Sequence, residues 1–469
     1  MERSTAVETV GREGSEVLLK GWVLARRNMG KIVFLDVRDR SGIVQVVCVP
    51  AELDAESAAT LDTIRGEFVL EIHGVVQARG AKQINPDMKT GTVEVLAKRV
   101  AVLATCPALP FEIDRDTSPV TEELRLKHRY LDMRSERVQR NVRLRSEMVR
   151  LMREYFFAKD FVEVETPYLT QSTPEGSRDF IIPSRLQPGK FFALPQSPQQ
   201  YKQLLMVGGI ERYFQIARCF RDEDPRADRG FEFTQLDLEM SFVNREDVMQ
   251  TLEEMTILVM EKLGYTIKQK PFPRVTYKEA MEKYGADKFD LRTEEDKANG
   301  VLAFAWVIDF PFFEKDEKSG GWTFTHNPFS TPMPEFVEDH LAHRNVENIV
   351  TAQYDLVCNG YEVGGGSIRA HLPELLRATY EIMGYSAEEI DDSIGHMLDA
   401  FQYGTPPHGG IALGIERLIM ILTGEKYVRE VQAFPMTGSG NTAVMHAPAM
   451  ISDKQATEYH IKPVMPEKK

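Results

Sequence analysis

Between about Val17 and Thr105, hydrophobic and polar residues alternate with a period of two, which is typical of half-buried β-strands. Five such segments occur, VLLKGWV, IVFLDVR, IVQVVCV, FVLEIHGVVQ and VEVLA, with one helical stretch at about 52–64 after the third. Five strands with a helix after the third predict an OB-fold barrel, a fold whose open face stacks and clamps unpaired bases. We therefore expect an all-β domain over residues 1–105.

The rest of the chain mixes helical and strand patterns, so the fold class is expected to be α+β. A proline-containing stretch after Cys106 is typical of a linker, which we place over residues 106–125. Between Leu124 and Arg153, ten Lys or Arg residues stand against three acids. This stretch indicates either a local basic surface or an ordinary solvated helix face. A single mixed domain is expected over residues 126–469.

Composition and charge narrow the class of protein. The longest apolar run, Val301 to Ile308, is too short to span a bilayer, so membrane insertion is not expected. The four cysteines are scattered and form no C-x-x-C pair, which predicts neither a zinc site nor a disulfide framework and favours a cytoplasmic setting. The formal net charge of −14 argues against a nucleic-acid partner on average, although a local basic surface remains compatible with it.

Two polar clusters indicate a nucleotide site. The block FRDEDPRADRGFEFTQLDLEMSF predicts a strand, turn, strand layout with Arg221 and Glu223 beside Phe233. An arginine fork suits a phosphate and an aromatic face suits an adenine ring, but a surface hairpin with salt bridges explains the same residues. In DLVCNGYEVGGGSIR, Asp355 and Glu362 border a strand and offer the oxygens that Mg²⁺ binds alongside phosphates.

Two further clusters belong to the same domain. GGIALGIERLIMILTG predicts a strand leading into an apolar helix that carries Glu416 and Arg417, where a lone arginine is usually structural unless phosphates lie nearby. TPEGSRDF and LPQSPQQYKQLL predict polar loops before a helix that begins near Ser197. No G-x-x-x-x-G-K-[ST] loop occurs, so the glycines at 364–366 indicate either close approach to a ligand or a tight turn.

Together with RLKHRYLDMR, FVEVETPYLT, YGTPPHGGIALGIERL and AFPMT, these motifs resemble, in order, those of bacterial aspartyl-tRNA synthetases over nearly all of residues 15–450. The resemblance implies a class II catalytic domain built on an antiparallel sheet flanked by helices. It implies ATP-dependent activation of L-aspartate with Mg²⁺ and transfer to tRNA(Asp), with tRNA(Asn) left open as a second acceptor. It also implies a homodimer that does not associate with membranes.

The resemblance assigns roles to single residues. Arg221 and Arg417 would be catalytic, on the α- and γ-phosphates. The ATP-binding residues would be Arg221, Glu223, Phe233, Glu362 and Arg417. Asp355 and Glu362 would hold Mg²⁺. L-Aspartate would be bound by Glu175, Ser197, Gln199, Lys202, Asp237, His326 and Arg369. Phe34, Gln45 and Glu94 would read anticodon bases, although Phe34 by itself is better explained as a core residue.

Some features depart from the family pattern. TYKEAMEKYGADKFDLR runs almost directly into VLAFAWVIDFPFF, where bacterial members usually carry an inserted domain, so we expect that domain to be absent. Asn327 follows His326 in place of a second histidine, and Met436 replaces a common lysine. Met29 lies where family members that charge only tRNA(Asp) tend to differ from members that also charge tRNA(Asn).

Three alternatives stay open: an asparaginyl-tRNA synthetase, a tRNA-independent ligase similar to asparagine synthetase A, and a non-enzymatic RNA-binding protein. Lys202 and Arg369 favour an anionic substrate over asparagine, and the N-terminal barrel favours a tRNA-dependent enzyme.

Overall fold

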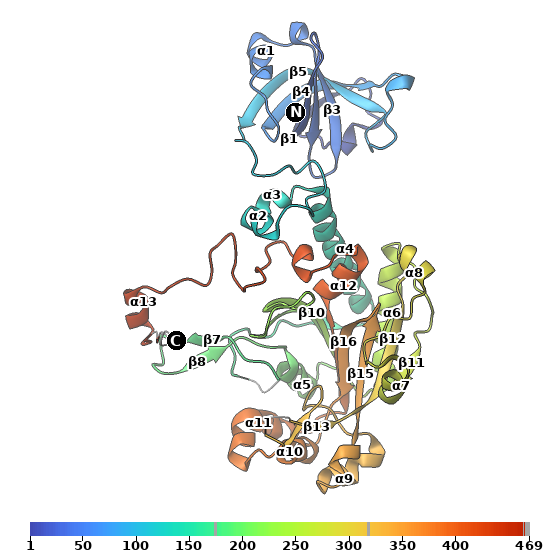
Figure 1. The fold of residues 1–469 in the computed structure, drawn as a ribbon, viewed down its shortest axis with the longest axis vertical. Coiled ribbons are helices and arrows are strands. Elements are labelled where there is room, and N and C mark those ends of the chain that lie inside the picture. The colour runs from blue at the N-terminus through green and yellow to red at the C-terminus, as the bar shows by residue number, and fades with distance from the viewer. Residues whose placement is uncertain (173–175, 317–318, 463, 465–469) are drawn as a thin grey trace. The chain divides into compact units, whose positions relative to one another are not determined.

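Two compact units make up the chain, residues Met1–Thr117 and Ser118–Lys469. The structure is a computed structural model that describes residues 1–172, 176–316, 319–462 and 464 (Figure 1). Throughout these residues, no helix is long and apolar enough to cross a membrane. The border between the two units falls inside the predicted linker.

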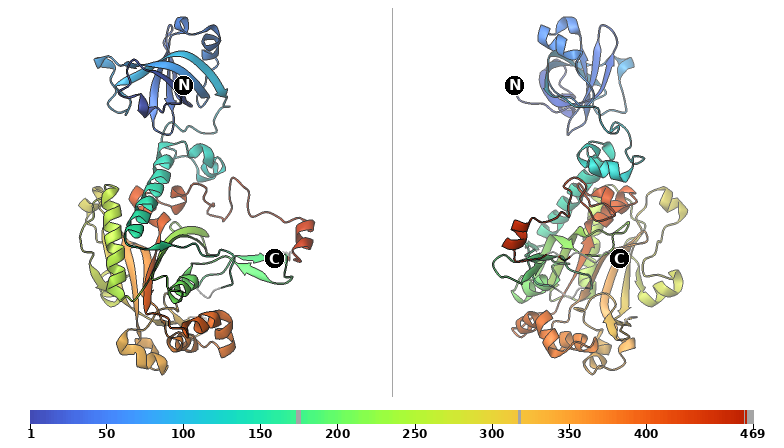
Figure 2. Two further views of the ribbon diagram at one scale, coloured as in Figure 1. Left: turned by 180° about the vertical axis from the view of Figure 1, so that it is seen from behind. Right: turned by 60° about the vertical axis from the view of Figure 1, so that its left-hand side comes forward.

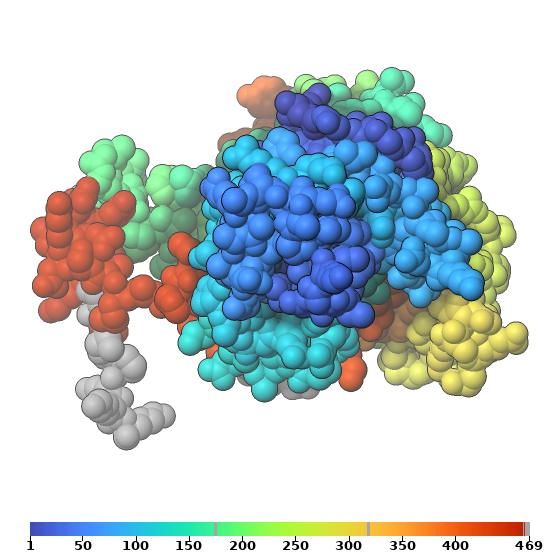
Figure 3. All heavy atoms as spheres, turned by 90° about the horizontal axis from the view of Figure 1, so that it is seen from above, coloured from blue at the N-terminus to red at the C-terminus, as the bar shows by residue number. Residues whose placement is uncertain are grey.

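The first unit is a closed five-stranded barrel with strand order β1-β2-β3-β5-β4, which confirms the predicted OB fold (Figure 2). Its strands are β1 (Glu16–Asn28), β2 (Val33–Arg38), β3 (Ile43–Cys48), β4 (Val69–Ala78) and β5 (Val93–Ala104). A short helix, α1 (Ala55–Leu61), follows β3 and is capped by Asp54, whose carboxylate accepts the Ser57 backbone N–H. Figure 3 shows one face of this unit, in blue, with all heavy atoms as spheres.

Alternation along β2 decides which side chains fill the barrel. Val33, Leu35 and Val37 are buried in the core, so Phe34, between two of them, points to the outer face and is only half-buried. The interpretation of Phe34 as a core residue is therefore wrong.

The second unit is built on an eight-stranded sheet with order β11-β12-β15-β16-β17-β10-β9-β6. Neighbouring strands are antiparallel except for the outermost pairs, β11 with β12 and β6 with β9. This confirms the predicted antiparallel class II architecture. The strands are β6 (Val162–Glu163), β9 (Arg212–Phe220), β10 (Glu232–Ser241), β11 (Arg274–Thr276), β12 (Phe304–Pro311), β15 (Val350–Cys358), β16 (Tyr361–Ile368) and β17 (His408–Gly414).

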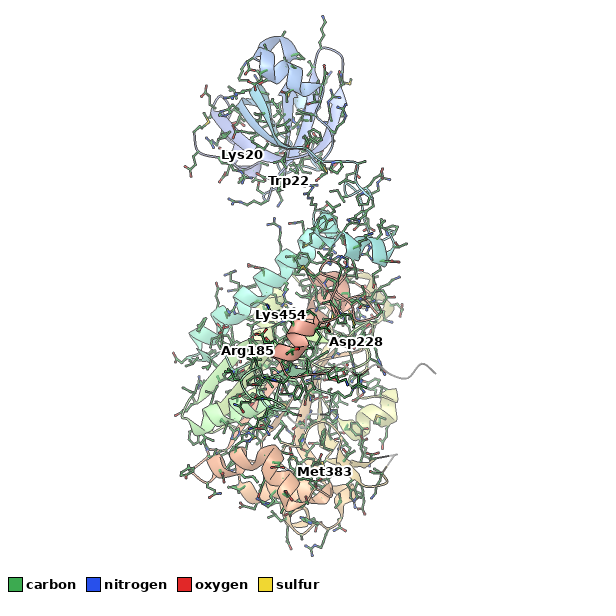
Figure 4. All side chains as sticks on the ribbon, turned by 90° about the vertical axis from the view of Figure 1, so that its left-hand side faces the viewer. Lys20, Trp22, Arg185, Asp228, Met383 and Lys454 are labelled. Carbon is green, nitrogen blue, oxygen red and sulfur yellow. The ribbon has the colours of Figure 1, made fainter. Side chains whose placement is uncertain are left out.

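Three helices cover one face of this sheet: α4 (Glu136–Ala158), α6 (Arg245–Lys262) and α12 (Ile415–Thr423). Their apolar residues form a single core with the inward-facing strand residues, such as Leu236 and Leu238 of β10. These three helices do not cover the opposite face of the central strands, which is the face that carries the candidate site. A second helical group, α5 (Gln199–Val207), α10 (Pro373–Ile382) and α11 (Ala387–Phe401), packs around Phe329, and Met383 at the end of α10 is labelled in Figure 4.

Short elements complete the unit. The strands β7 (Ile181–Pro183) with β8 (Phe191–Ala193), and β13 (Phe313–Lys315) with β14 (Trp322–Phe324), form two small hairpins. The remaining helices are α2 (Glu122–Lys127), α3 (Arg129–Asp132), α7 (Tyr277–Tyr284), α8 (Glu294–Ala298), α9 (Val337–Leu341) and α13 (Asp453–Glu458). Between α7 and β12 the chain forms only the five-residue helix α8, so no inserted domain lies there.

Two arginines of the basic stretch, Arg125 and Arg129, are buried and form no basic surface. Arg140, Arg143 and Arg150 on α4 are exposed, so the expectation of a solvated helix face holds for that part of the stretch. Arg125 is buried and donates to both carboxylate oxygens of Glu430 at 2.8 Å. Arg129, also buried, donates to the backbone carbonyls of Gln432 at 2.7 Å and Ala433 at 3.1 Å. These contacts fix the chain around Glu430 beside the sheet instead of presenting charge to a polyanion.

Candidate active site

The free face of β10 carries a row of polar side chains. Residues two apart on a strand share a face, so Phe233, Gln235, Asp237 and Glu239 project away from the helical core. Because β10 lies between β17 and β9, these side chains stand over the interior of the sheet and not at its edge.

Strand register brings the two predicted acidic sites into one line. Asp355 on β15 pairs with Gly365 on β16, Gly365 pairs with Ala412 on β17, and Ala412 pairs with Asp237 on β10. The two acids are thus separated by two of the smallest residues, which leave the floor between them open. A cavity of about 520 Å³ lies over this line, a size typical of small-molecule sites.

The cavity brings together almost every residue predicted for the site. At its nucleotide end it is lined by Arg221, Glu223, Phe233, Asp355, Glu362 and Arg417. At the end predicted for the amino acid it is lined by Ser197, Gln199, Lys202, Asp237 and Arg369, whereas His326, predicted for the same end, has its Nδ1 3.8 Å from an Asp355 oxygen. Glu175 lies outside the described residues.

Four buried charges form the amino-acid end. The Lys202 ammonium lies 2.9 Å from an Asp237 oxygen and 3.1 Å from a Glu239 oxygen, and Arg369 Nε donates to Glu239 at 2.9 Å. None of the four residues is more than 3% exposed. Two cations and two carboxylates balance, and Glu239 lies beneath the cations without lining the cavity. Sequence reasoning missed Glu239, although its spacing of two from Asp237 places both on one strand face.

The environment shifts the pKa values of this cluster apart. Burial raises the pKa of Asp237 to about 6, against the opposing effect of Lys202. For Glu239, burial alone would raise the pKa, but Arg369 and then Lys202 outweigh it and hold the pKa below its usual value. Burial lowers the pKa of the neighbouring His408 to about 4, so its ring is neutral and Nδ1 donates to the Pro406 carbonyl at 2.8 Å.

The second pair of acids could hold a divalent ion. An ideal Cβ on Gly365 would lie 2.9 Å from Asp355 Oδ1 and 3.6 Å from Glu362 Oε1, so glycine keeps space open between the two carboxylates. Among the described residues, no cluster of three or more His, Cys, Asp or Glu side chains could hold a metal. Two carboxylates fit an ion such as Mg²⁺, which takes its other ligands from water and substrate phosphates.

The surroundings shift the pKa values of the two acids in opposite directions. Burial, and then the charge of Glu362, raises the pKa of Asp355 well above its ordinary value, and Gln353 donates to Asp355 at 2.7 Å. Burial would also raise the pKa of Glu362, but Lys288 and then Arg417 lower it below its ordinary value. Lys288 lies 2.9 Å from Glu362 and was not found from the sequence.

The arginines at the nucleotide end lie against groups of their own chain. The Arg221 guanidinium lies over the Phe233 ring, 5.1 Å from its centre, as the predicted hairpin of β9 and β10 implied. Arg417 donates to the backbone carbonyl of Glu362 and pairs with Asp228 at 3.0 Å. Asp228, labelled in Figure 4, was also missed; it belongs to the loop between β9 and β10.

The barrel holds the other predicted residues on one outward face. Gln45 on β3 donates to Glu94 on β5 at 2.8 Å and accepts from Arg27 at 3.2 Å. Arg27 also pairs with Asp36 at 2.6 Å, and Phe34 is its register partner on β2. A half-buried aromatic ring beside a polar network offers both a stacking surface and hydrogen-bonding groups.

Comparison with known proteins identifies the family. Residues 121–438 match the family model described as tRNA synthetases class II (D, K and N), and residues 17–103 match the OB-fold nucleic acid binding domain. The aspartate–tRNA ligase of Geobacillus kaustophilus is 37% identical, with 97% of each chain covered. The chain belongs to the aspartate–tRNA ligase family of class II tRNA synthetases. The aspartate–tRNA(Asp/Asn) ligase of Bacillus subtilis is 38% identical, with 96% of each chain covered.

Lengths and solved structures add two points about this family member. The alignment with the Geobacillus protein runs over 577 positions against 469 residues here, so at least 108 of its positions have no counterpart in this chain. An asparaginyl-tRNA synthetase from Pyrococcus horikoshii matches the fold with a TM-score of 0.75 at 23% identity, covering 93% of this chain and 98% of its own. The synthetase fold is therefore complete without the extra positions of the bacterial relatives.

Proposed function

We infer that this chain is an aspartate–tRNA ligase, which activates L-aspartate with ATP and transfers it to tRNA. The observation that carries this conclusion is the pair Lys202 and Arg369, two buried cations held by Glu239 at the edge of a cavity that also contains a nucleotide end. A pair of cations suits a side-chain carboxylate, whereas the amide of asparagine offers them no negative charge.

The two ends of the cavity perform different tasks. Asp237 would accept a hydrogen bond from the substrate ammonium. Lys202 and Arg369 would bind the side-chain carboxylate, so that the α-carboxylate is directed toward the nucleotide. Ser197 and Gln199 line the same end and would orient the amino acid, together with His326, whose ring lies beside Asp355. The open floor at Gly365 and Ala412 would let the α-carboxylate approach the α-phosphate, so catalysis rests on positioning and charge stabilisation.

Arg221 and Arg417 would bind the triphosphate, with Phe233 supplying one face of the adenine site and Glu223 a polar contact. For this, Arg221 must leave the Phe233 ring that it covers, and Arg417 must give up Asp228. Asp355 and Glu362 would hold Mg²⁺, which supplies charge neutralisation on the phosphates when bound.

The barrel would recognise the anticodon of tRNA(Asp) through Phe34, Gln45 and Glu94. We accordingly assign residues 1–105 to anticodon binding, 106–125 to a linker and 126–469 to catalysis, in a cytoplasmic enzyme. Met29 is exposed in the loop before β2 and would contact the RNA. Bacterial relatives named aspartate–tRNA ligase and aspartate–tRNA(Asp/Asn) ligase match this chain equally well. That loop would therefore decide whether tRNA(Asn) is also charged.

The same fold would form a homodimer. The short strand β6 is the outermost strand of the sheet, and Val162 on it is 48% exposed, followed by Leu169 at 54%. An edge strand with exposed apolar residues is stabilised by pairing with a second copy. Closed two-fold pairs are the commonest oligomers.

Pyrophosphate exchange tests the function directly. We expect exchange that depends on L-aspartate and is at least about 10³-fold weaker with L-asparagine, together with aspartate charging of tRNA(Asp). Exchange with asparagine but not aspartate would favour an asparaginyl-tRNA synthetase, and asparagine formation without tRNA would favour the amide-forming ligase. Charging of tRNA(Asp) and tRNA(Asn) compared side by side would define the acceptor range.

A further inference from the structure

Lys288 lies in the nucleotide end of the cavity, where none of the roles assigned above requires it. Its ammonium pairs with Glu362 Oε2 at 2.9 Å, and its side chain lines the cavity together with Asp355 and Arg417. Glu362 is one of the two acids that would hold the divalent ion. A cation of the protein itself therefore occupies one oxygen of the metal-binding pair.

The fold holds this lysine in place. Helix α7 ends at Tyr284, and Lys288 lies in the loop that follows. This loop is fixed by Phe289, the residue after Lys288, whose ring is buried and stacks on Tyr284 with 4.3 Å between ring centres. The Phe289 carbonyl accepts the Gly360 backbone N–H at 3.1 Å, in the turn between β15 and β16. The loop is thereby joined to the same hairpin that carries Asp355 and Glu362.

We propose that Lys288 is the resident counter-ion of the metal-binding acids: it holds Glu362 in the free enzyme and weakens binding of a bare divalent ion, so that the ion binds well only together with nucleotide. This rests on the proposed function of Asp355 and Glu362. The lysine competes for Glu362 and repels a divalent cation at close range. When a triphosphate enters, it offers the ammonium another anionic partner in the same cavity, so Glu362 is released without leaving Lys288 unpaired.

Coupling between the two ligands follows from this arrangement. If ATP removes Lys288 from Glu362, ATP raises the affinity for the metal, and by linkage the metal raises the affinity for ATP by the same factor. Substituting the lysine removes the competitor. The bare ion should then bind more tightly, and the extra affinity conferred by ATP should shrink.

The experiment titrates Mn²⁺, as a paramagnetic replacement for Mg²⁺, into the full-length protein and measures free Mn²⁺ by electron paramagnetic resonance, with and without ATP and with no amino acid. In Lys288→Met we expect affinity for Mn²⁺ without ATP to rise at least about tenfold. Lys288→Arg keeps the charge and should resemble the wild type. Lys278→Met removes the same charge from an exposed position on α7, where Lys278 faces Glu282, and serves as the matched control.

Two results separate this proposal from the proposed function. If the wild type binds Mn²⁺ with ATP, but Lys288→Met shows no tighter binding of the bare ion than Lys278→Met, the counter-ion role is overturned and the metal site stands. If Mn²⁺ does not bind even with ATP, and Asp355→Asn changes nothing, the metal site itself is overturned. Because the side chains of Lys288 and Glu362 are 36% and 28% exposed, water can replace the lysine beside Glu362 in Lys288→Met.

Discussion

Arg369 offers the sharpest test of how the pocket selects aspartate. Aspartate and asparagine have nearly the same size, so the distinction must come from charge and hydrogen bonding. In the described part of the chain, bonds to Glu239 and Ser367 occupy three of the five guanidinium N–H groups of Arg369. The others are left for the substrate carboxylate.

The cost of removing Arg369 can be worked from its burial. Arg369 is 3% exposed and its partner Glu239 is fully buried. Breaking a buried pair by removing one partner costs about 3–5 kcal/mol, since the other charge is left uncompensated. At 1.4 kcal/mol for each tenfold change, the same loss at the substrate carboxylate weakens aspartate activation by about 10²-fold to about 4 × 10³-fold. Asparagine loses no ion pair and should be affected far less.

Arg369→Leu alone also leaves Glu239 with one cation fewer, which could destabilise the fold. The double variant Arg369→Leu/Glu239→Gln removes one charge of each sign and keeps the pair Lys202 and Asp237 neutral. Arg377→Leu serves as the control, because Arg377 lies on α10 in an exposed pair with Asp391.

Pyrophosphate exchange with each amino acid gives kcat/KM, and circular dichroism checks folding. The double variant should fold normally and lose discrimination. If it activates aspartate within tenfold of the wild type, or keeps its preference over asparagine, Arg369 does not bind the side-chain carboxylate.

Four further outcomes are expected from other features of the structure. Phe34→Ala should reduce tRNA charging about fivefold or more, because stacking on one base contributes about 1–3 kcal/mol. Gln45→Ala should also reduce it, through the loss of a hydrogen bond to a base. Both should leave aspartate activation nearly intact, and equal losses in both assays would contradict an anticodon role. Since burial raises the pKa of Asp237 to about 6, kcat/KM for aspartate should fall as the pH drops below about 6, where the protonated acid no longer binds an ammonium; a profile that stays flat to pH 5 would argue against it. Arg129→Lys loses the guanidinium group that donates hydrogen bonds to the Gln432 and Ala433 carbonyls. The free energy of unfolding, measured with urea, should therefore fall by about 2 kcal/mol. KM for ATP, measured by pyrophosphate exchange, should rise, and unchanged values of both quantities would refute this. Light scattering should give twice the chain mass, and an active monomer at assay concentration would exclude the dimer.

The barrel and the antiparallel sheet were predictable because their signals are local. Period-two alternation and the helix after the third strand specify the barrel, and the ordered motifs specify the class II domain. The arginines from 124 to 153 show where such reasoning fails. Composition counts charges but not their partners, and the partners of Arg125 and Arg137 are Glu430 and Glu425, about three hundred residues away.

Within the site, the residues carried by motifs were found, whereas those defined by pairing were not. Without the resemblance, Lys202 is better explained as a solvated helix residue, yet it is 1% exposed between two carboxylates. Its burial follows from α5 packing over the free face of β10, a contact that helix periodicity cannot show. Glu239 and Lys288 were missed for the same reason, because each acquires its meaning from a residue on another element.

The glycines link the two halves of the site. Gly365 makes room between the metal-binding acids, and on the next strand an ideal Cβ at Gly410 would lie only 2.1 Å from Glu239 Oε2. Gly410 pairs with Ser367, which accepts from Arg369, so the space for Glu239 and the position of the arginine depend on the same point of β16 and β17. Both glycines lie within extended strands, so what matters here is that they lack a side chain, and not that they can adopt a turn conformation. Glu239 and Asp355 each lie opposite such a glycine in the register of the sheet, and Asp237 lies opposite Ala412, the next smallest residue, so small residues on β16 and β17 make room for all three carboxylates.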